Sequence, residues 1–438
     1  MKKNIFLLTV FIMMCVTLPA TSPSSLAFSN SYLQRASGIE ALYWNPANIH
    51  KMTAKHQLTF FPFAFKIEDA FIFEQPEHFY FGYFKWKFDL YEMITGNILD
   101  DDYINAFINS KTNANGTYVG YAHKNFAVSY GFHILTNSRF DKNYYDLMYY
   151  GNEWSKTYHF TNKHNDFSYL NYTDLTLGYG GFHINPLFEK YLGNLPDIYG
   201  GASISYLLGE DLVDLGNYHY LLSDDDGLSL NRSATVHTAS GGHGFKMSFG
   251  LSGDVYKTKH DGKISVGVNV DNIYGFINWK KDAKERYYNA SFDDLDLSDP
   301  NFPNDFTKIF VVKNVIEKEI DSFTQKLPTI LRLGTVYSKN AMSVSLDFSK
   351  TSDTHGAYDS NPQLSAGFEY NFFDWLPVQL GCRFPIGDST TRYSFGFGVM
   401  RNRFEFGLGI QGQDDLFDIT NLIDLSGLGV AMQLKFMF

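Results

Sequence analysis

Apolar side chains alternate with small or polar ones along many short segments, and this period of two most constrains how the chain can fold. In residues 392–400, for example, Tyr393, Phe395 and Phe397 share one face, and serine and glycine residues share the other. Successive side chains of a β-strand point to opposite faces. Each such segment therefore predicts a strand with one apolar face and one small or polar face.

The pattern predicts fourteen strands spread along almost the whole chain. Their ranges are 56–64, 117–122, 125–134, 171–183, 198–207, 246–256, 262–270, 330–338, 341–349, 362–370, 376–384, 392–400, 402–411 and 428–438. No apolar run of about 18 residues follows the N-terminal region, so the sequence lacks the pattern of a helical membrane protein. The chain is predicted to be all-β.

The connections between these strands alternate between long and short. Long ones such as 65–116 and 271–329 are followed by turns such as 123–124 and 339–340. A soluble sandwich has no reason for this alternation, whereas an outer-membrane barrel has short periplasmic turns and long external loops. We therefore expect residues 56–438 to form a transmembrane antiparallel β-barrel of about 14 strands. Outer-membrane lipid is then its first partner.

The N-terminus has the features of an export signal. Lys2 and Lys3 precede an apolar stretch, and Ser25 and Ala27 are small residues at the positions that a signal peptidase reads. Residues 1–27 are predicted to be a signal peptide, which indicates the bacterial cell outer membrane as the destination. The net charge of −11 argues against a nucleic-acid partner, because phosphate recognition needs a basic surface.

Two segments resemble the FadL/PorV-like outer-membrane proteins, and specifically a branch of uncharacterised function. They are Ser37 to Asn48, which contains Asn45-Pro46-Ala47, and Leu327 to Tyr337. The resemblance implies that residues 28–55 form an N-terminal hatch inside the barrel, with Gly38, Asn45, Pro46 and Ala47 in its turn. Pro46 would fix φ, and Asn45 would hydrogen-bond its own backbone. The alternative is a flexible periplasmic leader.

The same resemblance suggests two functions. One is passive uptake or transfer of small hydrophobic or amphipathic molecules; the other is a PorV-like docking role for a secreted or surface protein. A loop-borne hydrolase is a third alternative. However, no G-x-S-x-G or H-E-x-x-H motif is present, so we expect no enzyme. We also expect no cofactor and no metal site, because the histidines and cysteines lack ligand spacing.

Charged residues fall on the strand faces predicted to line the lumen. The set is Lys246, Asp254, Lys263, Arg332, Asp347, Glu369, Arg383, Arg392, Arg403, Glu405 and Lys435. Most would pair with one another inside the barrel. Arginine binds carboxylates through its planar fork, so Arg332, Arg383, Arg392 and Arg403 are the candidate ligand-binding residues.

Two long connections contain helix-like stretches. Residues 91–108 follow an aromatic run, and residues 306–323 place Ile309, Val312, Ile316 and Ile320 at helical spacing. We expect such helices to cap the barrel mouth or to fold into it.

Overall fold

The computed structural model describes most of the chain after the N-terminal region. The described residues are 22–68, 109–139, 157–160, 166–185, 197–224, 227–257, 262–295, 314–352, 361–386, 391–401, 403–413 and 429–438. The expected helix at 91–108 lies outside these ranges.

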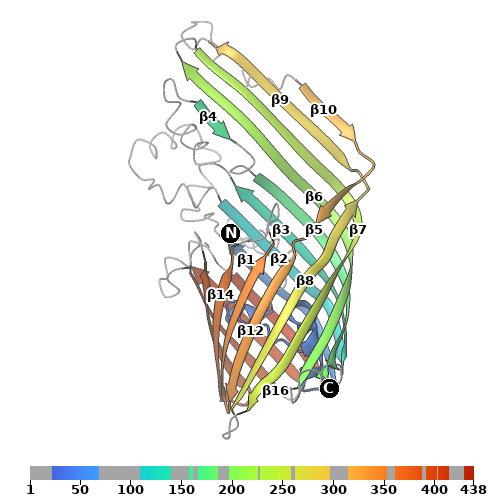
Figure 1. The fold of residues 1–438 in the computed structure, drawn as a ribbon, viewed down its shortest axis with the longest axis vertical. Helices are drawn as coiled ribbons and strands as arrows, with labels where there is room; N and C mark the ends of the chain where they lie inside the picture. Colours follow the sequence, from blue (N-terminus) through green and yellow to red (C-terminus); the bar gives the residue numbers. More distant parts are fainter. Residues whose placement is uncertain are drawn as a thin grey trace, which may run out of the picture.

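Fourteen strands form a closed antiparallel barrel (Figure 1). They are β1 (His56–Glu68), β2 (Asn109–His123), β3 (Phe126–Arg139), β5 (Asp166–His183), β6 (Ile198–Asp224), β7 (Gly227–Lys257), β8 (Lys263–Trp279), β12 (Ile330–Lys339), β13 (Met342–Thr351), β14 (Gln363–Phe373), β15 (Leu376–Pro385), β16 (Arg392–Arg401), β17 (Phe404–Gln413) and β18 (Gly429–Met437). Each predicted range overlaps one of these strands, so the predicted barrel and its strand number are confirmed.

The first and last strands close the barrel. β1 pairs with β18 over most of their length. His56 and Phe438 exchange backbone hydrogen bonds of 2.8 and 3.0 Å at the end of this ladder. A closed barrel leaves no sheet edge for another chain to pair with. The short turns lie at this same end, next to the C-terminus (Figure 1). Lys124 and Asn340 adopt positive φ in two of them, as tight hairpin turns require.

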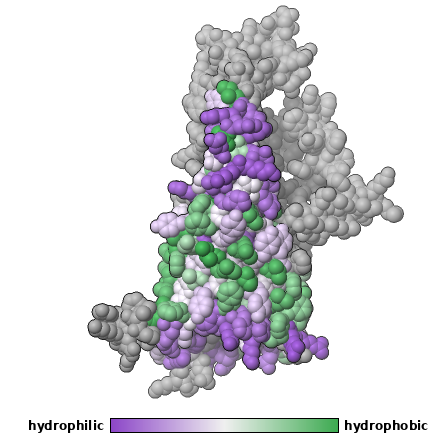
Figure 2. All heavy atoms as spheres, turned by 90° about the vertical axis from the view of Figure 1, so that its right-hand side faces the viewer, coloured by the Kyte–Doolittle hydropathy of each residue, from purple (hydrophilic) through white to green (hydrophobic). Residues whose placement is uncertain are grey.

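The alternation in the sequence separates the outside of the barrel from its inside. On β13 the burial pattern alternates strictly at first, with Val344 and Leu346 exposed and Ser343, Ser345 and Asp347 buried. On the face shown in Figure 2, exposed apolar side chains gather in a band across the barrel, with hydrophilic residues above and below it. Such a band flanked by polar zones is the surface expected of a barrel in lipid. Among the described residues, no helix is long and apolar enough to cross a membrane.

One side of the barrel wall rises far above the other (Figure 1). β6 and β7 contain 27 and 31 residues, whereas β18 contains 9. Four further strands widen this wall, namely β4 (Thr157–Phe160), β9 (Lys284–Leu295), β10 (Asn314–Glu319) and β11 (Phe323–Lys326). β9 pairs with β7 and β10, and β11 pairs with β8.

The expected helix at 306–323 is wrong for its described part. Asn314–Glu319 is strand β10, and all six of its residues pair with β9. Helical spacing of apolar residues in a short segment is a weak signal. Here a neighbouring strand supplies the backbone hydrogen bonds, and this tertiary pairing outweighs the local pattern.

Candidate functional site: the plugged lumen

Residues 22–51 lie inside the barrel and form what we call the plug. It contains α2 (Pro23–Ala27), α3 (Ala41–Trp44) and the 3-10 helix η1 (Pro46–Lys51). Leu33, Ile39, Leu42 and Ile49 are each at most 2% exposed. The segment is therefore packed against the wall. The region inside the barrel also starts earlier than expected, because residues 22–27 precede the predicted hatch at 28–55.

The predicted turn residues lie in the plug. Asn45 is fully buried, and its Oδ1 accepts a hydrogen bond of 3.1 Å from the Ala47 backbone. Its Nδ2 donates to the Leu251 carbonyl at 3.0 Å, which ties the turn to β7. Pro46 begins η1. Gly38 has φ +57°, and a Cβ there would collide with the Gln57 side chain, so only glycine fits.

Glycines of the wall make room for the plug. A Cβ on each of them would come within van der Waals distance of a plug residue, in most cases too close to be accommodated. They occur on eleven barrel strands: Gly120, Gly178, Gly180, Gly201, Gly250, Gly267, Gly334, Gly367, Gly381, Gly396, Gly407, Gly409 and Gly429. Interiors are close-packed, so these lumen-facing glycines allow the plug backbone to approach the strands closely.

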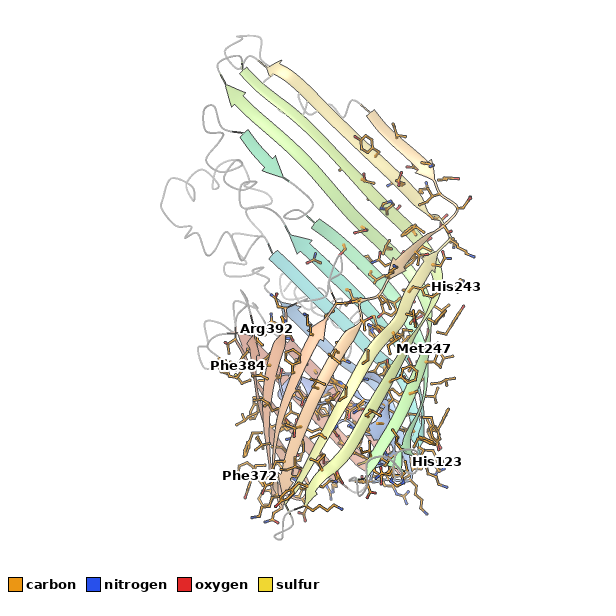
Figure 3. All side chains as sticks on the ribbon, viewed as in Figure 1. His123, His243, Met247, Phe372, Phe384 and Arg392 are labelled. Atoms are coloured by element: carbon orange, nitrogen blue, oxygen red, sulfur yellow. The ribbon has the colours of Figure 1, made fainter. Side chains whose placement is uncertain are left out.

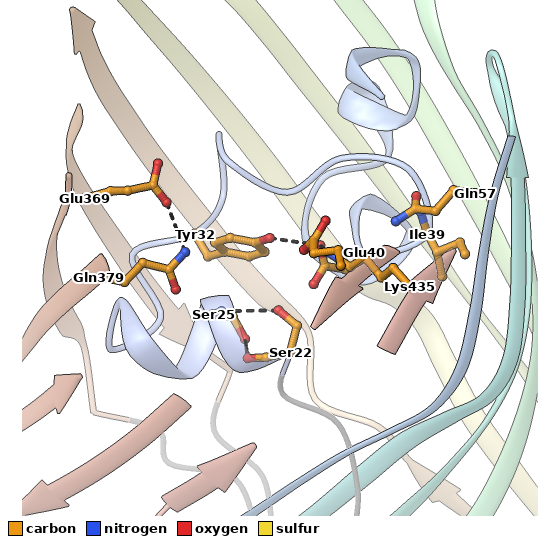
Figure 4. Close-up of polar contacts among 10 residues, drawn as sticks. Ser22, Ser25, Tyr32, Ile39, Glu40, Gln57, Glu369, Gln379 and Lys435 are labelled. Atoms are coloured by element: carbon orange, nitrogen blue, oxygen red, sulfur yellow. Dashed lines mark hydrogen bonds and ion pairs between the residues drawn. The ribbon is translucent and has the colours of Figure 1, made fainter. Parts of the chain in front are cut away.

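Buried charges hold the plug at one side of the lumen (Figure 4). The Lys435 ammonium donates to Glu40 and to Glu405, each at 2.9 Å. Tyr32 Oη donates to the same Glu40 oxygen at 2.9 Å. Burial, followed by the charge of Glu40, raises the pKa of Tyr32 well above its usual value, so this phenol stays a donor. Charge-assisted bonds of this kind are stronger than neutral ones.

A second anchor joins the plug to β13 and β14. Arg35 Nη1 donates to Ser343 at 2.7 Å and lies 3.5 Å from Glu369. The Leu33 backbone N–H donates to Asp347 at 2.7 Å. Glu369 also accepts from Gln379 at 3.0 Å (Figure 4). The plug is therefore bound to the wall through several of the charges that the sequence placed in the lumen.

The exit of the plug toward β1 is also fixed by polar contacts. Lys51 Nζ donates to Gln34 at 3.0 Å and to Ser252 at 2.8 Å. Burial lowers the pKa of Lys51 to about 8, and Asp254 only partly offsets this. The amine therefore sits where its charged form is disfavoured.

The four candidate arginines do not form one site. Arg332 on β12 donates to Asn269 at 2.9 Å, lies 3.6 Å from Asp271 and stacks over the Trp44 ring at 5.2 Å. Arg383 and Arg392 are buried and face each other in register on β15 and β16. Figure 3 places Arg392 at the end of the barrel away from the short turns.

The expectation that Arg403 lines the lumen is wrong. Arg403 is exposed in the turn between β16 and β17, outside the ladder that begins at Phe404. Arg403 lies in the turn, and the alternation of inward and outward side chains holds only within the strand. Its neighbour on the same predicted face, Glu405, does point inward and contacts Lys435.

A polar belt lies next to the plug on the tall side of the wall. We use this name for His133, Asp174, Lys246, Asp271 and Arg332. His133 lies 3.2 Å from Asp174, which also accepts from Thr176 at 2.7 Å. Asp271 accepts from Ser248 and from the Asn272 backbone. Each carboxylate of the belt thus has partners on the wall itself.

Lys246 differs from the other members of the belt. It is 7% exposed, and its ammonium lies 5.8 Å from the centre of the Tyr43 ring in the plug. Its charge acts on both Asp174 and Asp271. Among the described residues, however, no hydrogen-bond acceptor lies within bonding distance of it. The single ammonium of the belt therefore presents its N–H donors beside an aromatic side chain of the plug.

An apolar layer lies next to the belt on the same side of the wall, farther from the short turns between strands. We use this name for one cluster of buried residues: Leu135, Leu170, Tyr172, Leu207, Leu212, Ala239, Ile277, Trp279, Ala283 and Leu327. Trp279 is fully buried against Gly209 and Gly242, and its indole N–H has no partner among the described residues. His133 stacks on Tyr172 at 4.5 Å and joins the belt to this layer.

The strand pattern predicts Lys246 as a luminal charge, but the predicted ligand-binding residues are arginines. Phase within a strand shows which face a side chain occupies, but not which charges find partners across the barrel. The sequence does not point to Tyr43 or Trp44, because they precede the first strand and no alternating pattern shows which way their side chains face. Within the described part of the chain, no cluster of side chains could hold a metal ion.

Residues 212–409 match the model of a family described as a family of unknown function, DUF5723. No curated protein matches the chain. Among solved structures, the toluene transporter TodX of P. putida is similar with a TM-score of 0.43 and 11% identity, covering 96% of this chain and 99% of that one. A FadL homologue of Pseudomonas aeruginosa has a TM-score of 0.46 and 10% identity, covering 96% and 98%. The chain is thus similar over residues 212–409 to this family and, along most of its length, to these two solved proteins.

Proposed function

We propose that this protein is a bacterial outer-membrane barrel that takes up or transfers small amphipathic molecules. The observation that carries the proposal is Lys246, which is 7% exposed and lies between the plug and the apolar layer, and whose ammonium has no hydrogen-bond acceptor among the described residues. A buried charge is costly unless it is paired and hydrogen-bonded. A ligand oxygen placed there would supply the missing acceptor.

The surroundings of Lys246 suit a ligand with one polar end. Its head would meet Lys246 and the guanidinium of Arg332, with the Tyr43 and Trp44 rings beside it. Its hydrocarbon part would lie against the apolar layer, where buried side chains continue up β5 to β8. Binding sites for small molecules combine mostly apolar walls with a few polar groups that fix orientation. The belt and the layer have this composition.

Binding of two fluorescent probes of equal chain length tests the proposal, one ending in a carboxylate and one in an alcohol. The detergent-purified wild type should bind the carboxylate at least tenfold more tightly. Lys246→Met should remove this preference, and Lys246→Arg should keep most of it. Lys263→Met is the matched control, because Lys263 pairs with Asp254 in a partly exposed position. Equal binding of both probes by wild type and Lys246→Met would contradict the proposal.

Docking of a secreted or surface protein is the second candidate. It is favoured by the tall sheet of β6, β7, β9 and β10, which continues beyond the barrel on one side only (Figure 1). Ile316 on β10 is 61% exposed and Tyr287 on β9 is 38% exposed, so apolar side chains are available on this sheet. Ion pairs of Glu317 with Lys284 and Arg286 stiffen it.

A photo-crosslinking amino acid at Ile316 tests docking in intact cells. The control carries the same group at Leu346, which lies on the outward face of the barrel strand β13 and is 47% exposed. A discrete cross-linked protein from position 316 alone would support docking. Identical products from both positions would point to lipid or random neighbours and would contradict it.

A further inference from the structure

We propose that the signal peptide is cut off between Ala20 and Thr21. Ser22 to Ala27 then stay in the mature protein as the first part of the plug. The sequence alone favoured a cut after Ala27, because Ser25 and Ala27 have the small side chains that a signal peptidase reads. That cut would remove the whole of α2. The proposal is independent of what the barrel transports or binds.

The helix α2 is built into the lumen. Ser25 and Ala27 are fully buried, and Leu26 is 1% exposed. The helix contacts β15, β16, β17 and β18. An exported segment destined for removal has no reason to match four strands of the finished barrel. Leu26 also packs on Ala431 of the last strand as a separate buried cluster.

The wall opposite α2 is shaped for it. Any side chain on Gly409 would strike the Pro23 backbone, and one on Gly396 would strike Ala27. A Cβ added to Gly429 would lie 3.0 Å from the Leu26 side chain. These glycines lie on different strands, so each strand separately leaves space for α2. If α2 were removed, the same positions would border a void beside Phe28, and voids in a packed interior are destabilising.

The start of the helix shows that the cut must lie before Ser22. Ser22 is the N-cap: its Oγ accepts from the Ser25 N–H at 3.2 Å, and the Ser25 hydroxyl donates back to the Ser22 carbonyl at 2.9 Å. A cut before Pro23 would remove this cap and leave a charged amine on a buried residue, which is costly. A cut after Ala20 keeps the cap and places a small residue directly before the cut, with Leu18 at the second position that the peptidase reads.

Labelling of free amines on the purified outer-membrane protein, followed by digestion and mass spectrometry, tests the proposal. The expected N-terminal peptide begins at Thr21. A peptide that begins at Phe28 would overturn the proposal. The measurement does not depend on any activity of the barrel.

Two variants make the assignment sharper. Ala20→Leu should block cleavage and leave a precursor about 2 kDa heavier, because the large side chain occupies the position that must be small. Ala27→Leu should leave the cut in place, whatever it does to the fit of the plug, since processing precedes folding. Blocked processing in Ala27→Leu with normal processing in Ala20→Leu would overturn the proposal.

Discussion

Lys435, on the last strand of the barrel, donates a hydrogen bond of 2.9 Å to Glu40 in the plug. Both side chains are 6% exposed. The two residues are 395 positions apart, so this contact forms only when the first and the last parts of the chain have come together. It therefore couples closure of the barrel to docking of the plug.

Breaking this ion pair should destabilise the plugged barrel. Lys435→Met leaves the buried Glu40 and the partly exposed Glu405 without their cation. Loss of one partner of a buried pair typically costs about 3–5 kcal/mol. The temperature at which the detergent-folded form converts to the unfolded form on gels should fall. Lys263→Met removes a partly exposed pair and should change stability by less than about 1 kcal/mol. Equal shifts would show that Lys435 contributes no more than a surface charge.

Adding a side chain to a wall glycine should dislodge the plug. Gly381→Val would force the strand against the backbone of Phe28 and Ser29, and overpacking of this kind costs about 1–3 kcal/mol. We expect higher single-channel conductance in planar bilayers, because the lumen opens. Gly398→Val is the control, since its nearest neighbour is Pro377 rather than the plug. Unchanged conductance in both variants would mean that the plug does not close the lumen.

The apolar band predicts where a charged substitution will lower the stability of the barrel. Leu346→Arg places a charge in the band and should lower stability by about 2–4 kcal/mol near the bilayer midplane. Ile316→Arg makes the same change at a more exposed residue of β10, outside the band, and should cost little. Urea titration in lipid vesicles measures both. Comparable losses would show that the band does not face hydrocarbon.

Docking of the plug should tighten at alkaline pH through Lys51. Its pKa is lowered to about 8 by burial, whereas an unfolded lysine titrates near 10.4. The folded state therefore favours the neutral amine, and stability should rise as pH increases from about 8 to 10. Below about pH 8 this contribution is constant. Asp254 and Lys263 face the same amine.

The variant Lys51→Gln isolates this effect from other titrating groups. The difference in thermal stability between wild type and Lys51→Gln should change between pH 8 and 10, in favour of the wild type as pH rises. A difference that stays constant over this range would show that Lys51 keeps its usual pKa in the plugged barrel.

The barrel could be read from the sequence because its signals are local. Alternation along 341–349 and 392–400 reports which side chains face lipid, and two-residue turns such as the one at Asn340 set the register between neighbours. Closure then follows, because a sheet of this size in lipid cannot leave an edge unpaired. The same local signals place Lys246 and Arg332 in the lumen without identifying their partners.

Tertiary structure alone decided how the plug docks on the wall, how tall the wall is and which partners the luminal charges find. β10 carries a helix-like pattern and becomes a strand because β9 lies beside it. Glu40 meets Lys435, and α2 meets Gly396 and Gly409, only once the barrel has closed. Such contacts join segments hundreds of residues apart, and no periodicity encodes them. The face of a strand is set by its own residues, whereas the partner of a buried charge is set by the whole closed wall.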